Sequence, residues 1–166
     1  MSTPEQSDMP ETDANDTLDF DRSVLGVEVD IGSYHVTKEE IIAYARALGE
    51  TNPLYVDEEA ARAGPYGAVI APAGFYTYMR FRPGPNPRLR AHEGRLGYMA
   101  GQNIEYLEPI RAGDTISARA QISQVYAKTG RTGRLVFVVT RTTYSNQYGR
   151  AVMRVESSNV RSETMP

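Results

Sequence analysis

The sequence predicts one α+β domain in which helices come first along the chain and antiparallel strands follow. Apolar residues recur with helical spacing after residue 37, and after residue 95 they alternate in the manner of strands. The segments between the predicted strands are short enough for antiparallel neighbours, and this order of elements favours a sheet that covers a helix. The chain has 166 residues, which fits one domain, because domains most often have roughly 100 to 150 residues.

The composition excludes several classes of protein. With 40% hydrophobic and 23% charged residues the chain can bury a core, and the absence of cysteine excludes disulfides, thiolate metal sites and a cysteine nucleophile. No apolar run approaches the roughly 18 residues of a membrane span, and the acidic N-terminus lacks the order of a signal peptide. We therefore expect a soluble, cytoplasmic protein that does not insert into a membrane.

Charge is distributed unevenly along the chain. Residues 1–21 carry seven acidic residues and no Lys or Arg, and large apolar side chains are scarce there, so residues 1–22 are predicted to be a flexible tail before a domain at 23–162. The remainder is slightly basic, but no DNA-binding motif accompanies that charge, and a nucleic-acid partner is not expected. One local group of arginines has the chemistry to meet phosphates, although scattered surface positions are the simpler interpretation; it comprises Arg80, Arg82, Arg88, Arg90 and Arg95.

The predicted helices lie in the first half of the chain. Thr37 and Glu40 have the spacing of a capping box, and the apolar stripe that follows them ends at Gly49, a residue type that commonly terminates helices. A short helical stretch is expected at 57–63. A buried central helix is expected at 73–81, because a run of small and then aromatic residues follows a proline.

The second half of the chain has the pattern of a sheet. An extended segment at 24–36 precedes the helices, and four strands are expected at 97–107, 115–126, 135–144 and 151–161. In the strand at 115–126 the apolar residues alternate with polar ones, so one of its faces should be buried. The strand at 135–144 is apolar on both faces at its start, which is typical of a central strand.

Three segments together resemble the signature of a known family. They are Gly49-Glu-Thr-Asn-Pro-Leu-Tyr-Val-Asp-Glu-Glu-Ala60, Tyr66-Gly-Ala-Val-Ile-Ala-Pro-Ala-Gly-Phe75 and Glu105-Tyr-Leu-Glu-Pro-Ile-Arg-Ala-Gly-Asp-Thr115. They resemble the MaoC-like dehydratase and (R)-specific enoyl-CoA hydratase family, with the N-terminal-type MaoC domains most similar, over about residues 23–162. The resemblance implies a single hot-dog fold, in which an antiparallel sheet wraps around a central helix.

The resemblance also implies site residues. In active members an Asp and a His manage the water that adds to the double bond of an enoyl thioester, and Glu50 and Tyr55 occupy those positions here, with Asn52 between them. A backbone N–H from Ala73 or Gly74 would polarise the thioester carbonyl. Tyr, with a pKa near 10, donates a hydrogen bond at neutral pH but hardly accepts a proton from water. Of the aromatic cluster at 75–81, Phe75 and Tyr78 would line an acyl channel, although a place in the core is simpler.

Three functions are compatible with these departures from the motif. In the first, the chain is the subunit that lacks the Asp/His dyad, pairs with a catalytic MaoC-like paralogue and shapes the acyl tunnel. In the second, it is a self-sufficient homodimeric hydratase or dehydratase that uses Glu50. In the third, it is a non-catalytic acyl-CoA binding module whose arginines hold phosphates.

Some expectations are common to the three functions. The partner molecule is an acyl-CoA or acyl-carrier-protein thioester, as in fatty-acid or polyketide metabolism, and the chain forms a homodimer or a heterodimer. No cofactor and no metal is implied, because adding water needs no redox chemistry, and nucleotide-binding motifs and clustered metal ligands are lacking. Asn52 and Asp114 also have simple structural roles in turns, and His35 and His92 lie outside the motif.

Overall fold

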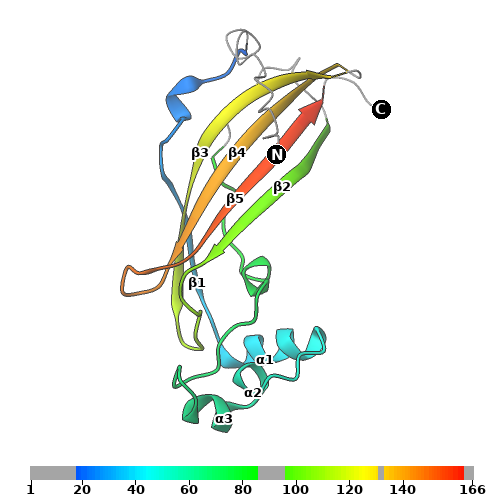
Figure 1. Ribbon diagram of the computed structural model, residues 1–166. Helices are drawn as coiled ribbons and strands as arrows, with labels where there is room; N and C mark the ends of the chain where they lie inside the picture. Colours follow the sequence, from blue (N-terminus) through cyan, green and yellow to red (C-terminus); the bar gives the residue numbers. More distant parts are fainter. Residues whose placement is uncertain (1–17, 86–95, 131–132, 163–166) are drawn as a thin grey trace, which may run out of the picture.

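The computed structural model describes residues 18–85, 96–130 and 133–162, and its main feature is one antiparallel sheet. Three helices lie together beyond one end of this sheet (Figure 1). The strands are β1 (Val29–His35), β2 (Leu96–Tyr106), β3 (Thr115–Gly130), β4 (Gly133–Ser145) and β5 (Ala151–Ser162), in the order β1-β3-β4-β5-β2. The predicted fold class, α+β with an antiparallel sheet, is confirmed.

Local signals in the sequence define the first helix. Thr37 accepts a hydrogen bond from the backbone of Glu40 while the Glu40 carboxylate accepts from the backbone of Thr37, so the capping box in front of α1 (Lys38–Ala47) is present. Gly49 follows the helix with a φ of 75°, the left-handed conformation that glycine adopts at little cost. Two short helices come next, α2 (Pro53–Val56) and α3 (Glu58–Ala63).

The carboxylate of Glu40 makes the start of α1 sensitive to pH. It accepts from the Tyr34 hydroxyl at 2.7 Å and from the Thr37 backbone at 3.0 Å. The bond from Tyr34 is the main cause that lowers the pKa of Glu40 below its ordinary 4.5, and the same bond raises the pKa of Tyr34 to about 12. A carboxyl group whose pKa is lowered on folding stabilises the folded state at pH values above its ordinary pKa. This stabilisation disappears as the pH falls through the lowered pKa.

We expect Glu40→Gln to lower the free energy of unfolding by about 1–2 kcal/mol at pH 7, because one amide oxygen replaces two accepting oxygens. The difference from wild type should shrink below pH 4 as Glu40 is protonated. Urea denaturation at several pH values measures it. Glu39→Gln, on the same turn but with an exposed side chain, is the control. An equal loss at every pH would contradict this account of Glu40.

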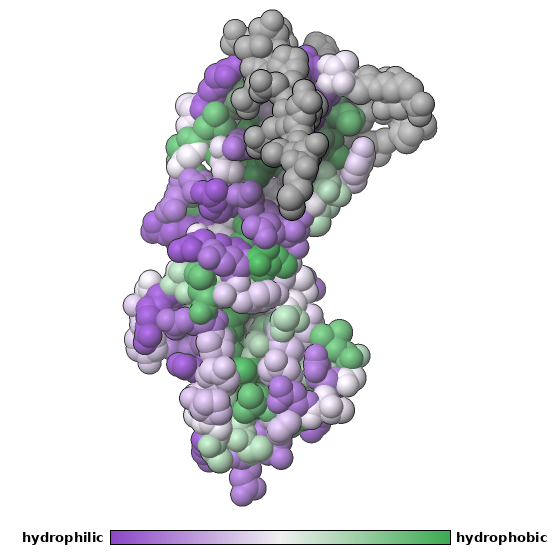
Figure 2. All heavy atoms as spheres, in the orientation of Figure 1, coloured by the Kyte–Doolittle hydropathy of each residue, from purple (hydrophilic) through white to green (hydrophobic). Residues whose placement is uncertain are grey.

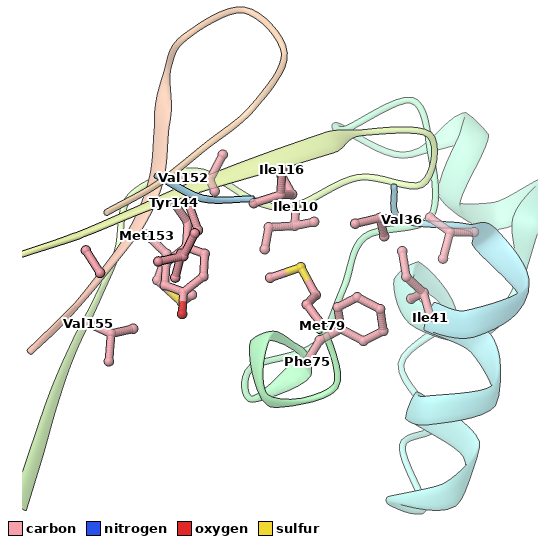
Figure 3. Close-up of a cluster of buried hydrophobic side chains, with 14 of the residues drawn as sticks. Val36, Ile41, Phe75, Met79, Ile110, Ile116, Tyr144, Val152, Met153 and Val155 are labelled. Carbon is pink, nitrogen blue, oxygen red and sulfur yellow. The ribbon is translucent and has the colours of Figure 1, made fainter. Parts of the chain in front are cut away.

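The main core cluster joins the sheet to the segment around the 3-10 turn and to the helices. Figure 3 shows side chains from the strands facing Phe75 and Met79, with Ile41 of α1 and Val36, just before α1, on the other side. The alternation predicted in the strand at 115–126 is confirmed, since its apolar residues are at most 1% exposed; they are Ile116, Ala118, Ala120 and Ile122. β4 pairs with β3 on one side and β5 on the other, which confirms the predicted central strand.

The central helix expected at 73–81 does not form. This segment contains one 3-10 turn, Phe75–Thr77, and the prediction of a helix there was wrong. Gly74 precedes the turn with a φ of 89°, which a helix starting at Pro72 cannot accommodate. Beyond the turn the backbone N–H of Arg82 donates to Ile31 at 2.8 Å, so the chain runs alongside β1 instead of continuing a helix.

The segment predicted as a flexible tail falls mostly outside the described residues. Of its last residues, Leu18 is buried and packs with Phe20 against Ala127 and Val136, from β3 and β4. On the face seen in Figure 2, hydrophilic side chains gather in a band across the middle of the molecule. Within residues 18–85, 96–130 and 133–162, no helix is long and apolar enough to cross a membrane.

Candidate functional site

A cavity of about 330 Å³ opens where the segment before the 3-10 turn meets the ends of β2 and β5. Its lining combines apolar residues with tyrosines and one carboxylate; it comprises Tyr66, Ala71, Pro72, Ala73, Gly74, Phe75, Tyr76, Tyr106, Leu107, Glu108, Pro109, Ile110, Val152 and Met153. Phe75, Val152 and Met153 are each 1% exposed, so this part of the lining belongs to the core. Such a cavity can hold a small apolar group next to polar atoms.

Backbone pairing brings the two sides of the cavity together. The N–H of Ala71 donates to the carbonyl of Ile110 at 2.8 Å, and the N–H of Ala112 donates to Val69, also at 2.8 Å. These bonds place the segment that leads to Gly74 beside the chain that leaves β2. Two of the three motif segments, residues 66–75 and 105–115, are therefore neighbours in space.

Gly74 has a hydrogen-bond partner within this cavity. Its backbone N–H donates to the hydroxyl oxygen of Tyr106, the last residue of β2, at 3.2 Å. A side chain on Gly74 would be strained at its φ of 89° and would place a Cβ 3.1 Å from the Tyr44 hydroxyl. Because only a single 3-10 turn follows Gly74, the dipole of a long helix does not strengthen this donor.

Aromatic rings pack beside the cavity. Phe75 meets Tyr44 edge to face at 5.4 Å between ring centroids, and it stacks on Tyr78 at 5.5 Å. Phe75 lines the cavity, whereas Tyr78 is not part of the lining and is 41% exposed. Of the two residues expected in an acyl channel, Phe75 thus lies in the lining of this cavity and Tyr78 does not.

Two consecutive side-chain hydrogen bonds link the 3-10 turn to β2 and β5 beside this aromatic packing. Tyr76 donates to the side-chain oxygen of Gln102 at 2.7 Å, and Gln102 donates to the Ser157 hydroxyl at 3.0 Å. Burial raises the pKa of Tyr76, and burial raises the pKa of the neighbouring Tyr144 to about 12. Both hydroxyls therefore stay protonated at neutral pH and cannot act as bases there.

The residues at the dyad positions lie elsewhere. Glu50 is exposed on the loop after α1, Asn52 is exposed at the start of α2, and Tyr55 is half-buried within α2. The Asn52 side-chain oxygen accepts from the backbone of Leu54 at 3.0 Å, so it serves as a helix cap, as its turn motif predicts. The structure brings Ala73, Gly74 and Phe75 together at the cavity, but Glu50, Asn52 and Tyr55 are not in its lining.

The remaining residues singled out from the sequence have other surroundings. Asp114 is buried and accepts from the Arg111 backbone at 2.8 Å and from Gln147 at 3.0 Å, which confirms its structural role. His35 lines a second cavity, of about 450 Å³, in which Lys38 and Arg62 are both paired with Glu58. His92, Arg88, Arg90 and Arg95 lie outside the described residues. Among the described residues, no group of three or more His, Cys, Asp or Glu is arranged to hold a metal ion.

Sequence reasoning missed two residues of this region, Tyr106 and Gln102. A partial signal existed, because Gln102, Ile104 and Tyr106 alternate along one strand and so share a face of the sheet. Their partners Tyr76 and Gly74 are 26 and 32 residues away, and no local pattern predicts contacts at such separations.

Comparison with known proteins places these features in context. The family described as "FAS1-like, dehydratase domain region" matches residues 23–155. A UPF0336 protein of Streptomyces griseus is 35% identical over 102 residues, which cover 59% of this chain and 67% of that protein. A probable enoyl-CoA hydratase alpha subunit of Thermomonospora curvata is 31% identical over 125 residues, 66% of this chain and 39% of that protein.

A solved structure shares the fold. The crystal structure of the C-terminally truncated HadBC complex of Mycobacterium tuberculosis, a 3R-hydroxyacyl-ACP dehydratase, superposes with a TM-score of 0.63 at 24% identity, and the match covers 84% of this chain and 98% of that one. The two chains therefore share the overall fold.

Proposed function

The chain belongs to the FAS1-like dehydratase family, a family of MaoC-like hydratases and dehydratases with the hot-dog fold, and from this premise we propose that it is the subunit without the Asp/His dyad. In this proposal it pairs with a catalytic hot-dog chain, which carries the dyad and adds water to, or removes it from, an acyl thioester. The present chain, without the dyad, shapes the space for the acyl group.

The observation that carries the proposal is the state of the three motif positions. Water addition needs a group that accepts a proton at neutral pH and lies within hydrogen-bond reach of the substrate. Tyr55 is a phenol, the Asn52 oxygen is engaged as a helix cap, and Glu50 is exposed on a loop, while the cavity beside Gly74 includes none of them. A base supplied by a second chain removes this deficiency.

The edge of the sheet supports pairing. β2 has 11 residues and is an edge strand, so among the described residues no strand pairs with the other side of its backbone. Exposed apolar side chains lie on it and just after it; they are Tyr98, Met99, Tyr106 and Leu107. Addition of a second sheet at this edge would cover Tyr98 and Met99 and would bring the partner's residues close to the cavity at the end of β2. HadBC, whose fold this chain shares, is itself a complex.

The cavity supports a role in binding the acyl group. Its buried apolar side, formed by Phe75, Val152 and Met153, suits a hydrocarbon, and the backbone N–H of Gly74 suits a thioester carbonyl. The substrate in this proposal is an acyl-CoA or an acyl-carrier-protein thioester. The reaction needs no cofactor, since water adds to a conjugated thioester without redox chemistry.

Met99→Glu tests the paired edge. A carboxylate in the middle of an apolar interface should weaken association by at least tenfold, because a buried unpaired charge is costly. Sedimentation velocity over a range of concentrations, of this chain alone and with its partner, measures the change. Leu48→Glu, at a position that is 57% exposed compared with 60% for Met99, is the matched control at the end of α1. Equal association of both variants would exclude β2 as the interface.

Co-expression tests the proposed role itself. A tagged copy of this chain should co-purify with a dyad-bearing MaoC-like paralogue, and the complex should hydrate crotonyl-CoA. The paralogue expressed without this chain should be less active or should accept a different range of acyl lengths. Full activity of the paralogue alone, with the same preference for acyl length, would contradict the proposed role.

A further inference from the structure

The backbone N–H of Gly74 is a donor that already has an acceptor. The resemblance assigns an N–H at this point of the chain to a thioester carbonyl, but the hydroxyl oxygen of Tyr106 accepts its hydrogen bond at 3.2 Å. A phenolic oxygen and a carbonyl oxygen are both acceptors, and one N–H makes one good bond at a time. A bound thioester and Tyr106 therefore compete for the same proton.

The donor is held in place more firmly than the acceptor. The Gly74 carbonyl accepts from the Thr77 hydroxyl at 2.8 Å and from the Thr77 backbone at 2.9 Å, which fixes the turn around it. The close approach of Tyr44 and the φ of 89° restrict this position to glycine. Tyr106, in contrast, is 54% exposed at the end of an edge strand, where its ring can turn toward solvent.

The cavity behind this pair has the size of a small ligand site. Its volume of about 330 Å³ lies at the lower end of the range for ligand pockets, roughly 300 to 1,000 Å³. Both Gly74 and Tyr106 belong to its lining, next to the buried apolar side chains of Phe75 and Met153. The same cavity thus offers an apolar side for a short acyl chain and, at Gly74, an N–H donor for a carbonyl oxygen.

We propose that Tyr106 closes the carbonyl-binding position of this chain, and that an acyl thioester enters the cavity only when the Tyr106 hydroxyl has left the N–H of Gly74. Tyr106 is in this sense a specificity-determining residue: it disfavours ligands that cannot replace its hydrogen bond. The inference rests on the proposed function for the identity of the ligand, whereas the competition for Gly74 depends only on the geometry.

Tyr106→Phe tests the competition, because phenylalanine keeps the ring and removes the hydroxyl. Tyr98→Phe is the matched control, since Tyr98 lies on the same strand and is 56% exposed. In amide NMR spectra of the full chain, the Gly74 proton should move upfield and exchange with solvent about three- to tenfold faster in Tyr106→Phe only, as expected for the loss of one hydrogen bond. An unchanged Gly74 signal in Tyr106→Phe would overturn the inference.

Ligand binding provides the second measurement. Tyr106→Phe should bind crotonyl-CoA about two- to tenfold more tightly than wild type and Tyr98→Phe in titration calorimetry, because the ligand no longer has to displace a hydroxyl. Equal affinity in the three proteins, or no binding in any of them, would overturn the closing role of Tyr106. Strong hydration of crotonyl-CoA by this chain alone would contradict the proposed function. The NMR signal of Gly74 does not depend on that result, so the two failures are distinguishable.

Discussion

In the proposed complex with a dyad-bearing chain, replacing the dyad histidine of that chain is expected to lower kcat for enoyl-thioester hydration by about a hundredfold or more, whereas Tyr55→Phe in this chain should leave kcat within about twofold. The difference arises because a positioned acid or base contributes factors of this size, while a phenol with no hydrogen-bond partner among the described residues moves no proton. Stopped-flow absorbance of the conjugated thioester in the purified complex measures both effects.

Glu50→Gln in the same complex is the companion variant. It removes the ionisable carboxylate and nearly preserves its shape, and the exposed position of Glu50 predicts an unchanged kcat. A loss of tenfold or more in Tyr55→Phe or Glu50→Gln, with assembly intact, would show that this chain contributes a reacting group.

Phe75→Ala is expected to lower the free energy of unfolding by about 3–5 kcal/mol, as large-to-small changes of buried aromatic residues do. Phe75 is 1% exposed and contacts the rings of Tyr44 and Tyr78, so its removal leaves a hole between the sheet and α1. Figure 3 shows its ring between the strand side chains and Ile41. Urea denaturation monitored by circular dichroism measures the change.

Tyr148→Ala is the control for this substitution. Tyr148 is an aromatic residue in the turn between β4 and β5 and is 72% exposed, so its removal should change the free energy of unfolding by less than about 0.5 kcal/mol. Phe75→Leu should recover a large part of the loss by refilling the hole. A loss below about 1 kcal/mol in Phe75→Ala would mean that the 3-10 turn is not part of the core.

Elements with local signals were predictable. The capping box of Thr37 and Glu40, the glycine after α1 and the alternation around Ile116 depend on residues close in sequence, and each is present in the structure. The central position of β4 was also predictable, because apolar residues on both faces are typical of strands in the interior of a sheet.

The segment at 73–81 was not predictable from its pattern. Its small and aromatic residues have helical spacing, but the left-handed conformation of Gly74 and the pairing of Arg82 with Ile31 oppose a helix. Packing of Phe75 and Met79 into the core stabilises the single turn instead. Tertiary contacts decided this element, and they do not appear in a local window of sequence.

In the candidate site, too, residues with a local sequence signal were predictable and residues brought together by tertiary contacts were not. The motif identified Gly74 and Phe75 at the cavity and identified the altered dyad positions, because these residues are contiguous in the sequence. Tyr106 was missed as the partner of Gly74, since the contact depends on how β2 and β5 end relative to the segment at 69–71. Pairing across the sheet sets such contacts, and one residue of register shift would turn Tyr106 to the other face.

The most direct measurement is the hydration of crotonyl-CoA, and of a longer enoyl-CoA, by the wild-type chain purified alone and by Glu50→Gln, followed as ultraviolet loss of the conjugated thioester. If the dyad resides in a partner, neither protein should exceed the background rate, and turnover should appear when a dyad-bearing chain is added. Turnover by the wild-type chain alone that disappears in Glu50→Gln would contradict this account and would make the chain a self-sufficient hydratase.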